Sequence, residues 1–179
     1  MTWSILARDE HGHFGVAIAS RFFAVGALCV HSRRGVGALS TQALMNPLYG
    51  PAGIEAMARG YGATDAIAML LAADDGRDQR QVHLLPASGP GAAHTGSACV
   101  DWCGHLVLDN LSVAGNMLAG PRVIEATAEA YLASAGRPMA ERLLAALDAG
   151  EAAGGDKRGK QSAALRVQRD EDYLSLDLR

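Results

Sequence analysis

Apolar and polar residues alternate over residues 3–7 at the start of the chain, and residues 14–19 form a second, apolar run after a polar turn. Alternation of this kind is typical of strands with one buried face, so the segment predicts a β-hairpin. Two further short apolar runs follow at residues 26–31 and 35–41. We expect these four strands to form one sheet.

Helical spacing replaces this alternation after Gly50. Pro51 stands at the expected first position of a helix, and apolar residues recur at three- and four-residue steps as far as Tyr61. Thr64 or Asp65 can cap a second helix. The buried side of that helix is expected to hold Ile67, Leu70 and Leu71.

The remaining elements come in blocks. Short apolar pieces between residues 81 and 113 indicate strands of a second sheet, Pro121 and Pro138 open two more helices, and residues 163–167 and 173–178 close the chain as strands. Blocks of strands and helices favour an α+β fold over a doubly wound parallel sheet. Two antiparallel sheets that each carry helices on one face can stack as a four-layer αββα sandwich. We expect a single domain over residues 1–179.

Composition narrows the classes of partner. The chain is 49% hydrophobic, and its 16 Lys and Arg against 19 Asp and Glu give a formal net charge of −3, which argues against nucleic acid. No apolar stretch is long enough to span a membrane. Three cysteines are too few for a disulfide framework and favour a reducing compartment, so a cytoplasmic location is expected.

Thr2 is the first candidate for chemistry. If Met1 is removed, as the small second residue leads us to expect, Thr2 gains a free α-amine beside its own hydroxyl. Such an amine has a pKa of about 7.7–8.0, which suits a general base at neutral pH. One residue then supplies both nucleophile and base. The competing interpretation is an ordinary surface Thr at the start of a strand.

Residues 154–162 resemble a phosphate-binding loop, but Gln161 stands where the Mg²⁺-binding Ser or Thr belongs. The loop also follows a helical pattern and leads into a strand, which is the wrong context for nucleotide binding. It still concentrates Asp156, Arg158 and Ser162 between two elements. A catalytic loop and a solvated connector both remain open.

Two other segments allow a functional and a structural interpretation. The loop from Thr41 to Pro51 contains Asn46 and Tyr49 and enters a helix, where unpaired backbone N–H groups can hold an oxyanion, although its proline dipeptides also suit simple turns. Cys99, Cys103 and His105 have a spacing that fits none of the common zinc templates, and we expect structural thiols and no metal there.

Five blocks of the sequence carry a resemblance to a known family. They are residues 2–5 with 15–21, 41–51, 99–102, 115–121 and 153–163. In this order they resemble the bacterial and archaeal domain-of-unknown-function family 1028 (DUF1028) over nearly the whole chain. The family's sequences continue past the position of Arg179, which implies a C-terminal extension.

The resemblance implies the N-terminal nucleophile hydrolase fold, the αββα sandwich also found in proteasome β subunits. Thr2 then matches the nucleophile position, and Ser20 and Arg21 match a polar pair at the end of the second strand. The segment from Gln42 to Asn46 falls where an oxyanion-hole amide is expected. Asn116 and Asp156 fall in the loops that orient the terminal amine. Apart from the resemblance, the polar loop over residues 154–162 offers Arg158, Gln161 and Ser162 as candidates for substrate binding. The catalytic lysine of the proteasome has no clear counterpart, because the corresponding strand reads Cys-Val-His-Ser-Arg.

The expected function is therefore hydrolysis of a small-molecule amide C–N bond through a Thr2 acyl-enzyme, without a cofactor. Arg21 or Arg158 can bind a substrate carboxylate. The alternatives are a ligand-binding or scaffold protein that keeps the fold without catalysis and, third, a zinc hydrolase. Neither nucleic acid nor membrane is expected as a partner, and assembly into a homo-oligomer stays open.

Overall fold

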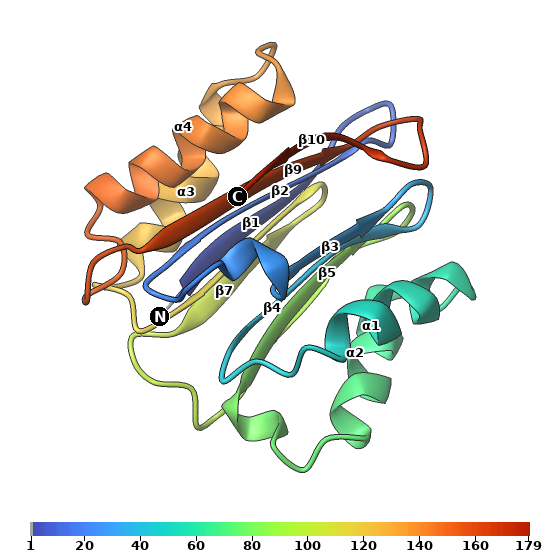
Figure 1. The fold of residues 1–179 in the computed structure, drawn as a ribbon, viewed down its shortest axis with the longest axis horizontal. Helices are drawn as coiled ribbons and strands as arrows, with labels where there is room; N and C mark the ends of the chain where they lie inside the picture. The colour runs from blue at the N-terminus through green and yellow to red at the C-terminus, as the bar shows by residue number, and fades with distance from the viewer. Residues whose placement is uncertain (1) are drawn as a thin grey trace.

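The computed structural model describes residues 2–179, so the expected removal of Met1 lies outside the described residues. Within them are two antiparallel sheets and four α-helices (Figure 1). The larger sheet has the order β10 (Leu174–Leu178), β9 (Ser162–Gln168), β2 (Phe14–Ser20), β1 (Thr2–Arg8), β8 (Leu111–Asn116) and β7 (Gly104–Leu108). The smaller sheet has the order β3 (Val30–Arg33), β4 (Gly37–Ala43), β5 (Arg80–Pro86) and β6 (Ala92–Thr95).

The helices lie on the outer faces of the two sheets. Helices α3 (Arg122–Ala133) and α4 (Met139–Ala152) cover the larger sheet, and α1 (Tyr49–Ala58) and α2 (Ala63–Ala72) cover the smaller one (Figure 1). The inner faces of the sheets meet, with β5 packing on β8 and β4 on β1 and β2. The predicted α+β class with two antiparallel sheets is confirmed.

The prediction that the first four strands form one sheet is wrong. Strands β1 and β2 belong to the larger sheet, whereas β3 and β4 belong to the smaller one. The connection between β2 and β3 contains the short 3-10 helix η1 (Val25–Ala27), and Val25 and Cys29 are buried with residues of both sheets. The later strands divide in the same way, because β5 and β6 join the smaller sheet and β7 and β8 the larger. Alternation predicts a strand but does not name its partner.

Helix α1 differs from the prediction at its start and at its end. It begins at Tyr49, so Pro51 is its third residue, where the N–H that proline lacks would have no partner within the helix. It ends at Ala58, so Tyr61 lies beyond it and is exposed, and its buried residues are Tyr49, Gly50, Gly53, Ala56 and Met57. A Cβ at Gly53 would lie 2.4 Å from Leu39 Cδ1, so glycine allows the helix to pack closely on the sheet.

The space between the sheets has an apolar part and a polar part. Leu6, Phe14 and Ile18 belong to an apolar cluster with Leu85 of the smaller sheet. Elsewhere between the sheets, hydroxyl, amide and imidazole side chains are fully buried instead, among them Ser4, Gln42, His83 and Ser112. Buried polar groups need hydrogen-bond partners, so the polar part must be an ordered network. The candidate site lies beside it.

Candidate functional site

Four polar residues form a row across adjacent strands of the larger sheet. Thr2 on β1 pairs with Ser20 on β2 and with Asn116 on β8, and Ser20 pairs with Ser162 on β9. Residues directly opposite one another project to the same face of a sheet. That face is the inner one, since Ser4, two residues after Thr2, hydrogen-bonds Gln42 of the smaller sheet. The row therefore points into the space between the sheets.

Thr2 is nearly buried, with 5% of its surface exposed. Its Oγ1 lies 2.9 Å from Oγ of Ser20, and either hydroxyl can donate this hydrogen bond. The β-ladders on both sides fix the backbone of Thr2. The hydroxyl is thus held in one place at the end of a central strand.

A cavity of about 510 Å³ opens at this position. Thr2, Gln42 and Asn116 contribute hydroxyl and amide groups to its wall. Much of the remaining wall is apolar and includes Val25, Leu44, Met45, Val100 and Met117. A largely apolar cavity of this size with a few convergent polar groups is the usual form of a small-molecule site.

Two arginines line the same cavity. Arg21 follows β2 directly, and Arg158 lies in the loop before β9. Nη1 of Arg21 donates to the carbonyl of Arg158 at 2.6 Å, and Nη2 of Arg158 donates to the carbonyl of Arg21 at 3.3 Å. Asp156 fastens both segments, because its carboxylate accepts the backbone N–H of Arg21 at 3.1 Å and of Arg158 at 2.8 Å.

Gln81 organises the amide groups at the cavity. Its Nε2 donates to the carbonyl of Gly115 at 2.8 Å and lies within 3.1 Å of the carbonyl of Gly104. Carbonyls only accept, so the NH₂ of Gln81 must face them and its Oε1 must face the other way. There it accepts from Gln42 Nε2 at 2.7 Å and from Asn116 Nδ2 at 3.0 Å. Gln81 therefore orients both amides.

The hydrogen bonds that fix this orientation continue through a series of buried side chains as far as Ser112. Oε1 of Gln42 accepts from the hydroxyl of Ser4 at 2.6 Å, so the oxygen of Ser4 must accept from Nε2 of His83 at 2.8 Å. Nδ1 of His83 then accepts from the hydroxyl of Ser112, also at 2.8 Å. Burial lowers the pKa of His83 to about 3, with a smaller contribution from His105. The imidazole is accordingly neutral at pH 7 and carries its proton on Nε2.

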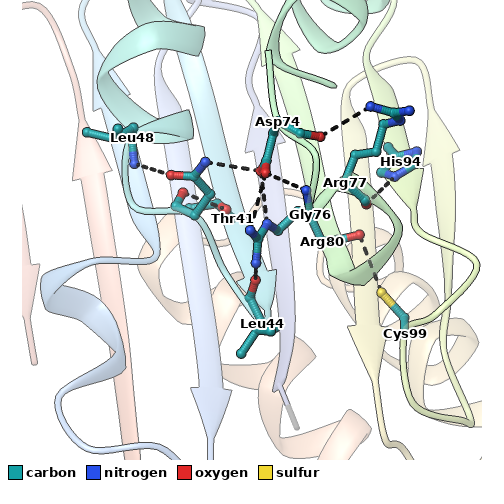
Figure 2. A network of polar contacts seen from close by, with 10 residues as sticks. Thr41, Leu44, Leu48, Asp74, Gly76, Arg77, Arg80, His94 and Cys99 are labelled. Carbon is teal, nitrogen blue, oxygen red and sulfur yellow. Dashed lines mark hydrogen bonds and ion pairs between the residues drawn. The ribbon is translucent and has the colours of Figure 1, made fainter. Parts of the chain in front are cut away.

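The loop after β4, which supplies Leu44 and Met45 to the cavity, is anchored from outside it. Figure 2 shows Arg80 between Asp74 and the carbonyl of Leu44, to which its Nη1 donates. Nε and Nη2 of Arg80 donate to the two oxygens of Asp74 at 2.9 and 3.3 Å. Asn46 Nδ2 donates to the same carboxylate at 3.1 Å. Hydrogen bonds from Arg80, and then from Asn46, hold the pKa of Asp74 well below its usual range.

Two non-glycine residues of the cavity wall have left-handed backbones. Ala43 has φ 70° and Met117 has φ 54°. This conformation costs a non-glycine residue about 1–2 kcal/mol. Ala43 is the last residue of β4 and Met117 directly follows β8, so the left-handed backbone marks the end of both strands. Backbone strain of this kind concentrates at functional sites.

The structure places the predicted site residues in three groups. Thr2, Arg21, Gln42, Asn116 and Arg158 line the cavity. A second group hydrogen-bonds residues of the wall or their neighbours: Ser20 bonds Thr2, Asp156 holds the arginine segments, Gln161 N–H donates to the carbonyl of Ser20, and Ser162 Oγ donates to the carbonyl of Phe22. Asn46 and Tyr49 are elsewhere, at a separate cavity of about 240 Å³ beside α1 and α2, where Asn46 holds Asp74.

Sequence reasoning missed Ser4, Gln81, His83 and Ser112. The signal was present, because Gln81 and His83 occupy alternate positions of an otherwise apolar strand, as do Thr2 and Ser4. Polar residues at inward positions indicate a buried network. Periodicity alone could not show that strands distant in sequence bring these residues together.

The cysteines and histidines considered for zinc do not converge. Cys99 Sγ donates to the carbonyl of Arg80 at 3.3 Å, and Cys103 Sγ donates to that of Cys99 at 3.6 Å. Burial raises the pKa of both thiols. Residues 2–179 contain no group of three or more His, Cys, Asp or Glu side chains placed to hold a metal ion.

Comparisons with known proteins agree on one family. No helix within residues 2–179 has the length and apolar character needed to cross a membrane. A search of curated proteins finds no match. Among solved structures, a crystal structure of a DUF1028 protein from Silicibacter pomeroyi matches with a TM-score of 0.86 and 33% identity, over 93% of this chain and 72% of that one. The model of the family of unknown function DUF1028 matches residues 2–179, and the chain belongs to this family.

Proposed function

We propose that this protein is an N-terminal nucleophile hydrolase that cleaves the C–N bond of a small-molecule amide, with Thr2 as the nucleophile. The observation that carries the proposal is the position of the Thr2 hydroxyl. It projects from the end of a central strand to a cavity of about 510 Å³ and is hydrogen-bonded to Ser20. Two side-chain amides, Gln42 and Asn116, lie on the same wall.

The chemistry follows from the groups of Thr2 itself once Met1 is removed. Oγ1 attacks the amide carbon, and its proton passes through a water to the α-amine. The tetrahedral intermediate collapses when the leaving nitrogen takes that proton and the C–N bond breaks, leaving an ester on Thr2. A water activated by the α-amine then hydrolyses the ester, which releases a carboxylate and restores the hydroxyl.

The amides of Asn116 and Gln42 suit stabilisation of the oxyanion. Each NH₂ group has two N–H donors and gives one hydrogen bond to Oε1 of Gln81. Because the orientation of Gln81 is fixed, the NH₂ groups of Gln42 and Asn116, and not their oxygens, face Oε1 of Gln81. An oriented donor that meets the developing charge contributes on the order of 3–4 kcal/mol to catalysis.

The layer order also supports the proposal. The layers are two helices, the six-stranded sheet, the four-stranded sheet and two more helices (Figure 1). The first residue of a central strand faces the gap between the two sheets. This arrangement is similar to the αββα sandwich of N-terminal nucleophile hydrolases, in which the nucleophile begins a central strand.

The alternative function is binding of a small ligand without catalysis. One observation favours it: within residues 2–179, no Lys, His, Asp or Glu side chain hydrogen-bonds the hydroxyl of Thr2. The base must then be the α-amine, and a protein that retains Met1 has no such amine. The two functions therefore separate on the state of the N-terminus.

The test combines the intact mass of protein made without an N-terminal tag with hydrolysis of a panel of small amides. We expect the mass of a chain that begins at Thr2. Thr2→Ala should fold and bind but not hydrolyse, and Thr2→Ser should keep part of the activity. Thr64→Ala, on the exposed side of α2, is the matched control. Full turnover by Thr2→Ala, or by protein that retains Met1, would refute the proposal.

A further inference from the structure

The charges around the cavity have one sign. Among the described residues that line it, Arg21 and Arg158 are cations and none is Asp or Glu. The side chain of Asp156 is 0% exposed and engages the backbone N–H groups of these two residues from behind. The guanidinium of Arg158 is also ion-paired with this carboxylate, Nη2 to Oδ2 at 3.4 Å, but its side chain remains 41% exposed. A ligand in the cavity therefore meets positive charge.

Both cations lie to the same side of Thr2. Arg21 follows β2, which is the neighbour of β1, and Arg158 precedes β9, the next strand in the sheet. Their mutual hydrogen bonds fasten the two head groups to each other's backbone. A guanidinium group matches the planar, bidentate geometry of a carboxylate.

The other side of Thr2 is apolar and uncovered. Leu44 and Val100 line the cavity although 63% and 55% of their surfaces are exposed. Met117, just after β8, lines the same side. Large apolar side chains grouped at the mouth of a cavity gain free energy when an apolar group of a ligand covers them.

We infer that the cavity takes an amide that carries both a carboxylate and an apolar chain, as an N-acyl amino acid does. The carboxylate lies beside Arg21 and Arg158, and the apolar chain lies on Leu44, Val100 and Met117. The inference rests on the proposed function for the position of the amide bond over Thr2. The recognition of the two ends rests on the charges and the exposed apolar side chains alone.

The experiment is calorimetric titration of the Thr2→Ala protein with three probes: N-hexanoylglycine, its neutral primary carboxamide and N-acetylglycine. We expect hexanoylglycine to bind at least about tenfold more tightly than the carboxamide, because a charge-assisted contact is lost. It should also exceed acetylglycine by at least about tenfold, because of the added methylenes. Equal affinity for the acid and the carboxamide, or for the long and the short chain, would overturn the inference.

Arg21→Gln and Arg158→Gln should each bring the ratio of acid to carboxamide affinity toward one, and the matched exposed control Arg59→Gln should leave it unchanged. If either variant fails to fold, added salt gives the same test, since it should weaken binding of the acid but not of the carboxamide. Wild-type turnover separates the two proposals. Selective binding without hydrolysis removes only the hydrolase, and equal hydrolysis of amides with and without a carboxylate removes only the inference.

Discussion

The hydroxyl oxygens of Thr2 and Ser20 lie 2.9 Å apart on neighbouring strands, at the position where each strand ends its pairing with the other. Ser20 has no exposed surface, so no solvent can take its place. Its hydroxyl therefore orients that of Thr2. The pairing of the two strands therefore positions the hydroxyl that the proposed chemistry needs.

Ser20→Ala should lower kcat/KM by about fivefold, because the loss of a hydrogen bond worth about 1 kcal/mol leaves the Thr2 hydroxyl less well oriented. The fold should persist. Ser134→Ala, which removes a hydroxyl bonded to α3 far from the cavity, is the control. Steady-state kinetics with a cleaved amide checks this, and unchanged kcat/KM would show that Ser20 does not position the nucleophile.

Asp156→Asn should lower both the melting temperature and the affinity for ligand. An amide keeps one acceptor oxygen but replaces the other with a donor, which cannot accept from the N–H of Arg21 or Arg158. The expected decrease in Tm is about 3–6 °C. The exposed Asp148→Asn on α4 serves as the control. A normal melting temperature together with lost affinity would instead assign Asp156 a direct role in binding.

Gln81→Met should destabilise the protein by about 1–3 kcal/mol, because the carbonyl of Gly115 and the amides of Gln42 and Asn116 lose a buried partner. Turnover should fall more than this loss explains, since the freed amides can rotate. Gln168→Met is the matched control: its Nε2 also donates to two backbone carbonyls, but away from the cavity. Urea unfolding and kinetics of both variants measure the difference. Equal kinetics in the two would contradict a positioning role.

Asp74→Asn should loosen the loop that begins with Leu44 and Met45. Arg80 loses its charged partner, and the free energy of unfolding should fall by about 2 kcal/mol. Hydrogen exchange of residues 43–46 should accelerate, and ligand affinity should decrease with it. Glu129→Gln removes an exposed ion pair with Arg122 on α3 and should change neither quantity. Unchanged exchange in Asp74→Asn would show that the loop does not depend on this anchor.

Acid should destabilise the protein partly through His83. The folded pKa of His83 is lowered to about 3, whereas an unfolded histidine titrates near its ordinary value of 6.5. Between these values the unfolded chain binds the extra proton, so stability falls as the pH decreases from about 6.5 toward 3. The total effect is on the order of 5 kcal/mol.

Replacement of His83 by Gln should flatten that part of the stability curve, measured as urea midpoints from about pH 7.5 to 4.5. Glutamine can still contact Ser4 and Ser112 but does not titrate. His105→Gln is the control for the other histidine of this region. A slope equal to that of the wild type in His83→Gln would show that His83 does not carry the acid sensitivity.

Much of the fold could be predicted because local patterns decide it. Alternation located β1, an apolar run located β2, and glycine and proline marked most helix boundaries. Pairing between the later strands could not be predicted, because β5 and β8 carry similar apolar residues yet belong to different sheets. The sheet that each strand joins is decided only when the whole chain packs.

Part of the candidate site could also be predicted from local features of the sequence. Thr2 could be proposed from its place behind Met1, since the chemistry of an α-amine is a local property. The roles of Gln81 and His83 depend on hydrogen bonds to residues far away in the sequence, such as Ser4 and Gly115. Tyr49 lies in the predicted loop region but faces a different cavity, because α1 begins at that residue and turns its side chain toward α2.

The register of β1 makes the proposed activity a test of correct folding. A slip of one residue against β2 would turn the Thr2 hydroxyl from the gap between the sheets to the face that α3 and α4 cover, and would bring Trp3 into the gap. No intermediate placement exists on a pleated strand. Molecules that assemble this strand wrongly would be inert rather than weakly active, so damage to the sheet should reduce the number of working molecules and leave the rate of each survivor unchanged.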